Sequence, residues 1–369
     1  MAHHHHHHGS MRIRRNQSTL SHNERLAFTN AVLELKRRPS RLPMSLGSTS
    51  RYDDYVYWHL QSMENQTSTT PGWAHRGPAF LPWHRYYLNQ FEEDLQRIDH
   101  TVTLPYWDWT VDNSTDSSVP GSPWTDDFMG GDGDPTQEYT VTTGPFTGDN
   151  WKLTLFDHHE NEPHNARLRR QLGTTLNASG NTISINLPTD SEVQNCLLET
   201  PYYVSPWRAG QDVNQPALNP TKPSFCNRLE GWYGAGSIHN KVHVWVAGAT
   251  EGSMIWMSSP NDPVFFLHHA NIDRLWVQWQ ANNPNEGYHP TGNGNEVGPT
   301  GHNLNDSMNP WGRKVTPNNV LNHYSLGYTY DTDSTPLSEI FMHTFNLKIR
   351  KEKQIKDGHF GLSQEDLDK

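Results

Sequence analysis

Two histidines four residues apart, His239 and His243, constrain this chain more than any other feature of its sequence. On an α-helix, side chains at this spacing project side by side from one face, so both imidazoles can bind one metal ion. A histidine from a later helix, His268 or His269, can complete a set of three ligands and leave coordination positions open for a substrate. The sequence therefore predicts a helical scaffold built around a metal ion.

A second set of three histidines, His59, His75 and His84, precedes the first in the chain. Two such sets without ligand cysteines indicate a pair of metal ions, and imidazole ligands suit copper, zinc, iron or nickel. A zinc hydrolase is the least favoured interpretation, because its sites more often mix carboxylates among the ligands. Other histidines are interpreted as surface or packing residues: His22, His100, His289, His302, His323, His343 and His359.

Three further histidines, His158, His159 and His164, lie in an acidic, loop-like stretch. We expect them to be solvated, with adventitious metal binding as the alternative. Residues 1–10 contain a six-histidine run followed by Gly-Ser, so we interpret them as an expression tag and exclude them from the fold.

The composition favours long ordered loops between a limited number of helices. Hydrophobic residues make up only 33% of the chain, while 27 glycines and 25 prolines interrupt it. The 14 tryptophans can still fill a core, because each aromatic side chain buries a large area.

The net charge of −11 argues against nucleic acid as a partner, because phosphate binding needs a concentrated positive surface. No window is long and apolar enough for a membrane span, and no signal peptide follows the tag, which leaves the cellular location open. The two cysteines, Cys196 and Cys226, are compatible with one disulfide or with two buried thiols.

Helical patterns surround both histidine sets. Ser21 and Glu24 have the spacing of a capping box, and apolar residues follow at helical spacing. Pro82 and Pro263 predict helix starts, because proline is favoured in the first turn, with Asp262 as the cap of the later helix. Helices are expected at about 22–37, 52–62, 82–98, 191–200 and 262–281 and around His239, with a short hairpin within 174–187.

Four motifs carry a resemblance to a known family: Phe80–Arg85, Pro105–Trp109, His239–His243 and Asn261–His269. With their order and spacing, they resemble the tyrosinase branch of the type-3 copper proteins, and the similarity extends from about residue 14 to residue 330. The resemblance is greatest to compact bacterial tyrosinases. It implies a mainly α fold, in which a four-helix-bundle core with long loops and a few short strands holds two copper ions that bind dioxygen.

The same resemblance assigns roles to individual residues. His59, His75 and His84 would bind the first copper, and His239, His243 and His269 the second, with His268 only a neighbour. Glu230 and Asn240 stand where the family holds a water that removes the phenol proton, which implies monophenol hydroxylation as well as diphenol oxidation. A purely structural Glu230 carboxylate, for example a helix cap, is the alternative. Asp273 is expected to fix the tautomer of a ligand histidine, and Asp108 to anchor a loop behind the bundle.

The resemblance also outlines the domain and its alternatives. Residues 11–330 would form the catalytic domain, closed by a Tyr328-Thr329-Tyr330 motif that meets Arg14, and residues 331–369 a tail that is a short lid or disordered. The expected partners are small phenols, with a copper-delivery helper protein as a possible addition. The competing functions are a catechol oxidase or o-aminophenol oxidase without monophenolase activity, and a haemocyanin-like oxygen carrier.

Overall fold

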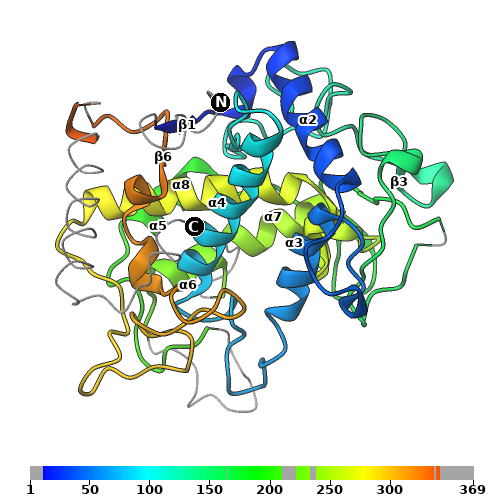
Figure 1. Ribbon diagram of the computed structural model, residues 1–369. Helices are drawn as coiled ribbons and strands as arrows, with labels where there is room; N and C mark the ends of the chain where they lie inside the picture. Colours follow the sequence, from blue (N-terminus) through cyan, green and yellow to red (C-terminus); the bar gives the residue numbers. More distant parts are fainter. Residues whose placement is uncertain (1–10, 164, 210–221, 233–237, 336–337, 341–369) are drawn as a thin grey trace.

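A computed structural model describes residues 11–163, 165–209, 222–232, 238–335 and 338–340. The expected tag and most of the expected tail lie outside these residues. The described chain is mainly helical (Figure 1). Its α-helices are α2 (His22–Arg37), α3 (Arg51–Gln61), α4 (Phe80–Ile98), α5 (Asp190–Leu197), α6 (Phe225–Glu230), α7 (Ile238–Ala247) and α8 (Val264–Asn282).

Within the described residues, six short strands form three separate two-stranded sheets. β1 (Arg12–Arg14) pairs in parallel with β6 (Tyr328–Tyr330), so the two ends of the described domain meet. β2 (Gly133–Asp134) pairs with β3 (Thr140–Val141), and β4 (Thr174–Leu176) with β5 (Thr182–Ser184), both antiparallel. The β4–β5 pair confirms the expected hairpin. The mainly α class with long loops and a few short strands is therefore confirmed.

The first residues of α2, α4 and α8 can be compared with the starts expected from capping residues and prolines. At α2, Ser21 and Glu24 form the complete capping box. The expected start of α4 at Pro82 is wrong, because the helix begins at Phe80 and the proline occupies the third position. This position is still in the first turn, where the missing N–H has no intrahelical partner. Pro263 caps α8 instead of opening it, and the Asp262 carboxylate accepts a hydrogen bond from the N–H of Val264 at 3.1 Å.

Other boundaries also differ from expectation. The helix expected at 191–200 is α5 and ends at Leu197, and the short helix α6 was missed because it follows a Pro- and Asn-rich loop.

Both cysteines are free and buried, so the disulfide alternative is wrong. Among the described residues, none of the helices combines the length and the apolar character that a membrane span requires.

Aromatic rings pack α3, α4 and α8 together. Phe91 of α4 stacks on Phe266 of α8 with ring centroids 3.7 Å apart, and Tyr52 and Tyr55 of α3 contact the same pair edge-on. Eight tryptophans are fully buried, as expected for core packing: Trp83, Trp107, Trp109, Trp124, Trp151, Trp245, Trp276 and Trp279. A regular four-helix bundle stays a prediction, and this packing supports it.

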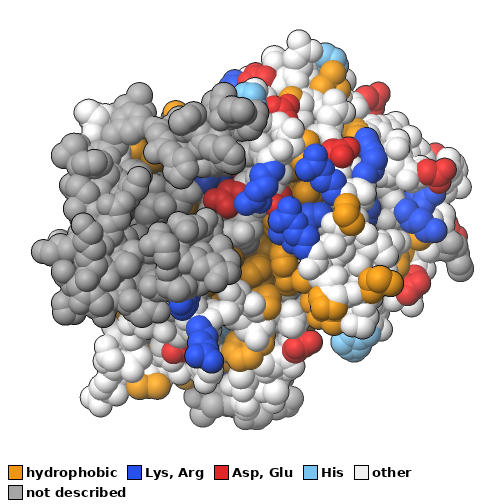
Figure 2. All heavy atoms as spheres, viewed as in Figure 1, with side chains coloured by type: hydrophobic (Ala, Val, Ile, Leu, Met, Phe, Trp, Pro, Cys, Tyr) orange, Lys and Arg blue, Asp and Glu red, His pale blue; other side chains and the backbone are white. Residues whose placement is uncertain are grey.

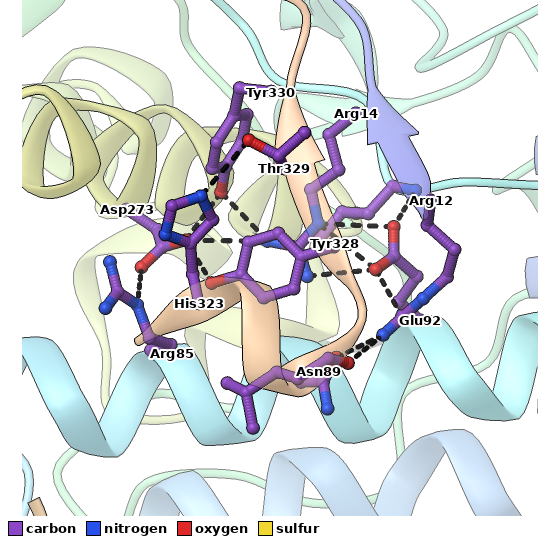
Figure 3. Close-up of polar contacts among 12 residues, drawn as sticks. Arg12, Arg14, Arg85, Asn89, Glu92, Asp273, His323, Tyr328, Thr329 and Tyr330 are labelled. Atoms are coloured by element: carbon purple, nitrogen blue, oxygen red, sulfur yellow. Dashed lines mark hydrogen bonds and ion pairs between the residues drawn. The ribbon is translucent and has the colours of Figure 1, made fainter. Parts of the chain in front are cut away.

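A buried ionic network joins the domain ends to the helices (Figure 3). Arg14 of β1 donates to the Glu92 carboxylate of α4 at 3.0 Å and to the Tyr330 hydroxyl at 2.8 Å. Its guanidinium also lies over the Tyr328 ring, 3.6 Å from the centroid. The expected contact between Arg14 and the Tyr328–Tyr330 motif is therefore confirmed.

Basic and acidic side chains both lie on the face in Figure 2. Lys and Arg side chains gather there where α2, α3 and α4 meet, with acidic side chains among them. Arg51 of α3 and Arg97 of α4 share the Asp94 carboxylate at 2.9 and 2.6 Å.

Candidate metal centre

The upstream histidines form one compact group, which we call the first trio. His59 comes from α3, His84 from α4, and His75 from the loop between them. Their ring centroids lie 4.8 Å apart for His59 and His75, 5.0 Å for His75 and His84, and 5.7 Å for His59 and His84. The three ligand-capable atoms lie within 4.8 Å of one another, close enough to surround one ion.

The downstream histidines form the second trio. His239 and His243 project from α7 as the i, i+4 spacing predicts, and His269 faces them from α8. The Nε2 atom of His239 lies 3.0 Å from Nε2 of His243 and 3.2 Å from Nε2 of His269. Three side-chain nitrogens therefore converge on one point.

Main-chain carbonyls orient four of the six rings. Nδ1 of His59 lies 2.6 Å from the Met257 oxygen and Nδ1 of His243 lies 2.7 Å from the Met254 oxygen. Because a carbonyl only accepts, each of these Nδ1 atoms must carry the proton, which leaves Nε2 with a free lone pair. The same holds for His84, bonded to the Phe80 oxygen at 2.7 Å, and for His239, bonded to the Glu230 oxygen at 3.1 Å.

This arrangement fits a bound cation. Nε2 of His239 and Nε2 of His243 both present lone pairs across 3.0 Å, so they cannot hydrogen-bond to each other. In the first trio, Nε2 of His59 and Nε2 of His84 are buried without a hydrogen-bond partner. A buried polar atom without a partner is costly unless something binds it. Both trios therefore fit a metal ion held by neutral imidazoles.

Burial keeps these imidazoles neutral. It lowers the pKa of His59 to about 3 and that of His243 to about 4, and it holds the pKa of His84 and His269 well below the usual range. Loss of hydration disfavours the charged ring in each case. At neutral pH no proton competes with a metal for the free nitrogen.

The two trios lie against each other. The His84 ring of the first trio stacks on the His269 ring of the second, with centroids 4.3 Å apart and planes 11° apart. Phe265 contacts His59 and His269, with centroids 5.0 and 4.3 Å away. Two ions bound here would be neighbours in one apolar enclosure, able to share a small ligand.

His268 has a different environment from the six trio histidines. Its Nδ1 lies 3.1 Å from the Trp109 indole nitrogen, which can only donate, and its Nε2 lies 3.2 Å from the His239 carbonyl oxygen, which can only accept. Both ring nitrogens are thus occupied by protein. Although its atoms lie near the second trio, this pairing supports the interpretation of His268 as a neighbour.

Glu230 is fully buried at the end of α6, beside the centre. Its two carboxylate oxygens accept hydrogen bonds from the backbone N–H of Arg76 at 3.1 and 2.9 Å. Burial raises the pKa of Glu230 to about 7, against the lowering effect of the Arg76 hydrogen bond. Asn240 presents Oδ1 to Nδ1 of His239 at 2.9 Å. The structure therefore places both predicted residues next to the second trio.

The expected role of Asp273 is wrong. Its carboxylate contacts no ligand histidine; it accepts from Arg85 at 2.7 Å and from the hydroxyls of Tyr328 and Tyr330 at 2.6 and 2.7 Å. One turn of α8 carries it away from the trio and into the ionic network of Figure 3. Backbone carbonyls orient the histidines instead.

Asp108 behaves as expected of a loop anchor. Its carboxylate accepts from the N–H and the hydroxyl of Thr110 at 3.1 and 2.6 Å, and it lies 3.8 Å from Arg274 of α8. Sequence reasoning missed the carbonyls of Met254 and Met257 and the backbone N–H of Arg76. No side-chain pattern could have identified them, because these interactions use the main chain.

Comparisons with known proteins agree with this geometry. A family model, the common central domain of tyrosinase, matches residues 49–282. A tyrosinase of Streptomyces glaucescens is 39% identical to this chain, and the match covers 88% of this chain and 100% of that tyrosinase. The grixazone synthase of Streptomyces griseus is 37% identical, and the match covers 86% of this chain and 99% of that protein. A solved polyphenol oxidase from Thermothelomyces thermophila is 27% identical with a TM-score of 0.52, covering 74% of this chain and 71% of that one. The chain therefore belongs to the tyrosinase family.

Proposed function

We propose that this chain hydroxylates monophenols and oxidises o-diphenols to o-quinones with dioxygen, as a tyrosinase. The observation that carries the proposal is the pair of adjacent trios with buried, unprotonated nitrogens directed into a common enclosure. The relatives named tyrosinase, which this chain matches over most of its length, support it. We assign the activity to residues 11–330.

We propose copper as the metal, with His59, His75 and His84 as ligands of one ion and His239, His243 and His269 as ligands of the other. Imidazole suits copper, and the two bound ions would supply the binding and reduction of dioxygen. In the overall balance, a monophenol and one dioxygen give an o-quinone and one water, while two o-diphenols and one dioxygen give two o-quinones and two waters.

The residues of the chain contribute proton transfer and enclosure. A phenol loses its proton at a pKa of about 10, so hydroxylation benefits from a nearby base. Glu230 is that base in our proposal, because its raised pKa makes its carboxylate a stronger proton acceptor than an ordinary glutamate. In our proposal Asn240, whose side-chain oxygen lies 2.9 Å from Nδ1 of His239, holds with Glu230 the water that takes up the phenol proton. Phe265 and the buried helices exclude bulk water from the reacting groups.

The test compares Glu230→Gln with the unchanged protein on tyrosine, catechol and o-aminophenol, following oxygen uptake and quinone absorbance. We expect the substitution to lower the rate on tyrosine at least tenfold more than the rate on catechol. Glu93→Gln serves as the matched control, because Glu93 is a half-buried glutamate on a different helix, α4. Equal losses on both substrates would remove Glu230 from its role as the base.

The same assay separates the alternatives. Turnover of catechol or o-aminophenol alone would indicate an oxidase without monophenolase activity. Reversible oxygen binding without turnover would indicate a haemocyanin-like carrier. We also propose that a helper protein delivers the copper. If Cu²⁺ loads the purified metal-free chain without any other protein, no helper is needed.

A further inference from the structure

A third group of metal-ligating side chains lies outside both trios. Asp157, His158 and His159 follow one another in a turn, and their ligand-capable atoms lie within 4.8 Å of one another. Nδ1 of His158 lies 3.8 Å from the Asp157 carboxylate, and the two imidazole rings have centroids 4.0 Å apart. The His158 side chain is 86% exposed, so an ion in solvent can reach it.

The spacing suits one ion. Copper and zinc bind imidazole nitrogen and carboxylate oxygen at about 2.0–2.2 Å, so one ion can touch two atoms that lie 3.8 Å apart. Two imidazoles and one carboxylate form a donor set that Cu²⁺ and Zn²⁺ accept, with Cu²⁺ bound more tightly. Glu160 and Glu162 follow in the same stretch of a chain with a net charge of −11, and this acidic setting attracts cations.

This turn also supports the loop behind the metal centre. The Asp157 carboxylate accepts a hydrogen bond from the N–H of Met257 at 3.2 Å, and the carbonyl of the same residue accepts from Nδ1 of His59 at 2.6 Å. The Ser258 hydroxyl donates to the Glu160 carboxylate. Met257 therefore links the exposed group to the first trio, because its N–H bonds to Asp157 and its carbonyl bonds to His59.

We propose that Asp157, His158 and His159 form a third metal site, distinct from the two trios, that binds Cu²⁺ or Zn²⁺ at the surface. The bound ion fixes the Asp157 carboxylate and thereby stiffens the loop that carries Met257. This inference rests on the donor set and its contacts, so it does not depend on the proposed oxidase activity.

The test measures bound metal in the chain lacking residues 1–10, because the six-histidine run would itself bind metal. After equilibration with buffered Cu²⁺, a double variant, His158→Ala with His159→Ala, should hold one equivalent fewer than the unchanged chain. His22→Ala is the matched control, since His22 is an exposed histidine 2.8 Å from a carboxylate, that of Asp127, without a second imidazole. Equal metal content in the double variant and the unchanged chain would overturn the site.

A second measurement tests the coupling to Met257. Zn²⁺ should slow hydrogen exchange of the Met257 N–H at least tenfold in the unchanged chain and have no such effect in the double variant. The same slowing in both proteins, or in neither, would overturn the coupling. Because both measurements compare variants of one protein, they remain decisive even if the trios bind no copper or the chain oxidises no phenol.

Discussion

The carboxylate of Glu230 lies directly against the backbone N–H of Arg76, with both oxygens within 3.1 Å of the nitrogen. Arg76 follows His75 of the first trio, and the carbonyl of Glu230 accepts from His239 of the second trio. Arg76 has a φ of 64°, a left-handed conformation that side chains other than glycine rarely adopt. Glu230 thus connects both trios, through its carboxylate on one side and its main-chain carbonyl on the other. Strain of the kind seen at Arg76 persists where the surrounding contacts hold it.

The position of Glu230 predicts a pH dependence. Burial raises its pKa to about 7, so its carboxylate, the form able to accept a proton, predominates only above that pH. We expect hydroxylation of tyrosine, relative to oxidation of catechol, to increase as the pH rises through about 7. Glu230→Gln should remove this inflection from the kcat/KM profile. Glu160→Gln is the control: burial also raises the pKa of Glu160 to about 7, but this variant should retain the inflection. If the inflection survives Glu230→Gln, the titrating group is not Glu230.

Removing one ligand from each trio tests the metal assignment. His84→Ala and His243→Ala should each lower the copper content of the tag-free chain by at least one equivalent and abolish catechol oxidation, because two imidazoles hold an ion more weakly than three. Copper analysis and oxygen uptake measure both effects, with the exposed His22→Ala as control. Retention of full copper content in either variant would argue against that trio as the site.

Substitution of His268 should affect stability but not copper binding, unlike substitution of its neighbour His269. Replacing His268 with alanine leaves the buried Trp109 N–H without a partner and removes a hydrogen bond to the His239 carbonyl, so the free energy of unfolding should fall by about 2–4 kcal/mol. Copper content should stay at the unsubstituted level. Denaturant unfolding and metal analysis of the same sample check this, and a loss of copper from the folded variant would show that His268 is a ligand.

Asp273 should contribute to stability and not to metal binding. In Asp273→Ala, two buried guanidiniums, those of Arg14 and Arg85, lose a carboxylate partner, which should lower the free energy of unfolding by about 3–5 kcal/mol. At temperatures where the variant is folded, its copper content should match that of the unchanged protein. A selective loss of copper without destabilisation would restore the role first expected from the sequence.

Side-chain periodicity carried most of the predictions that were confirmed. The i, i+4 pair on α7, the capping box at Ser21 and the hairpin at 174–184 are local features, determined by residues a few positions apart. The resemblance selected His269 over its neighbour His268, a choice that the partners of both His268 ring nitrogens support and that stays a prediction. The misplaced start of α4 and the missed helix α6 show the limit of such rules, since packing of the flanking residues moves helix ends.

By itself, the sequence determined which residues are candidate donors, six histidines in two sets, and a helical spacing for one pair of them. Only the tertiary structure decided how these donors are oriented. The carbonyls of Met254 and Met257 set the tautomers, and Asp273 serves an ionic network and not a ligand. The physical reason is that every residue carries a carbonyl, so only the path of the chain determines which one meets an imidazole.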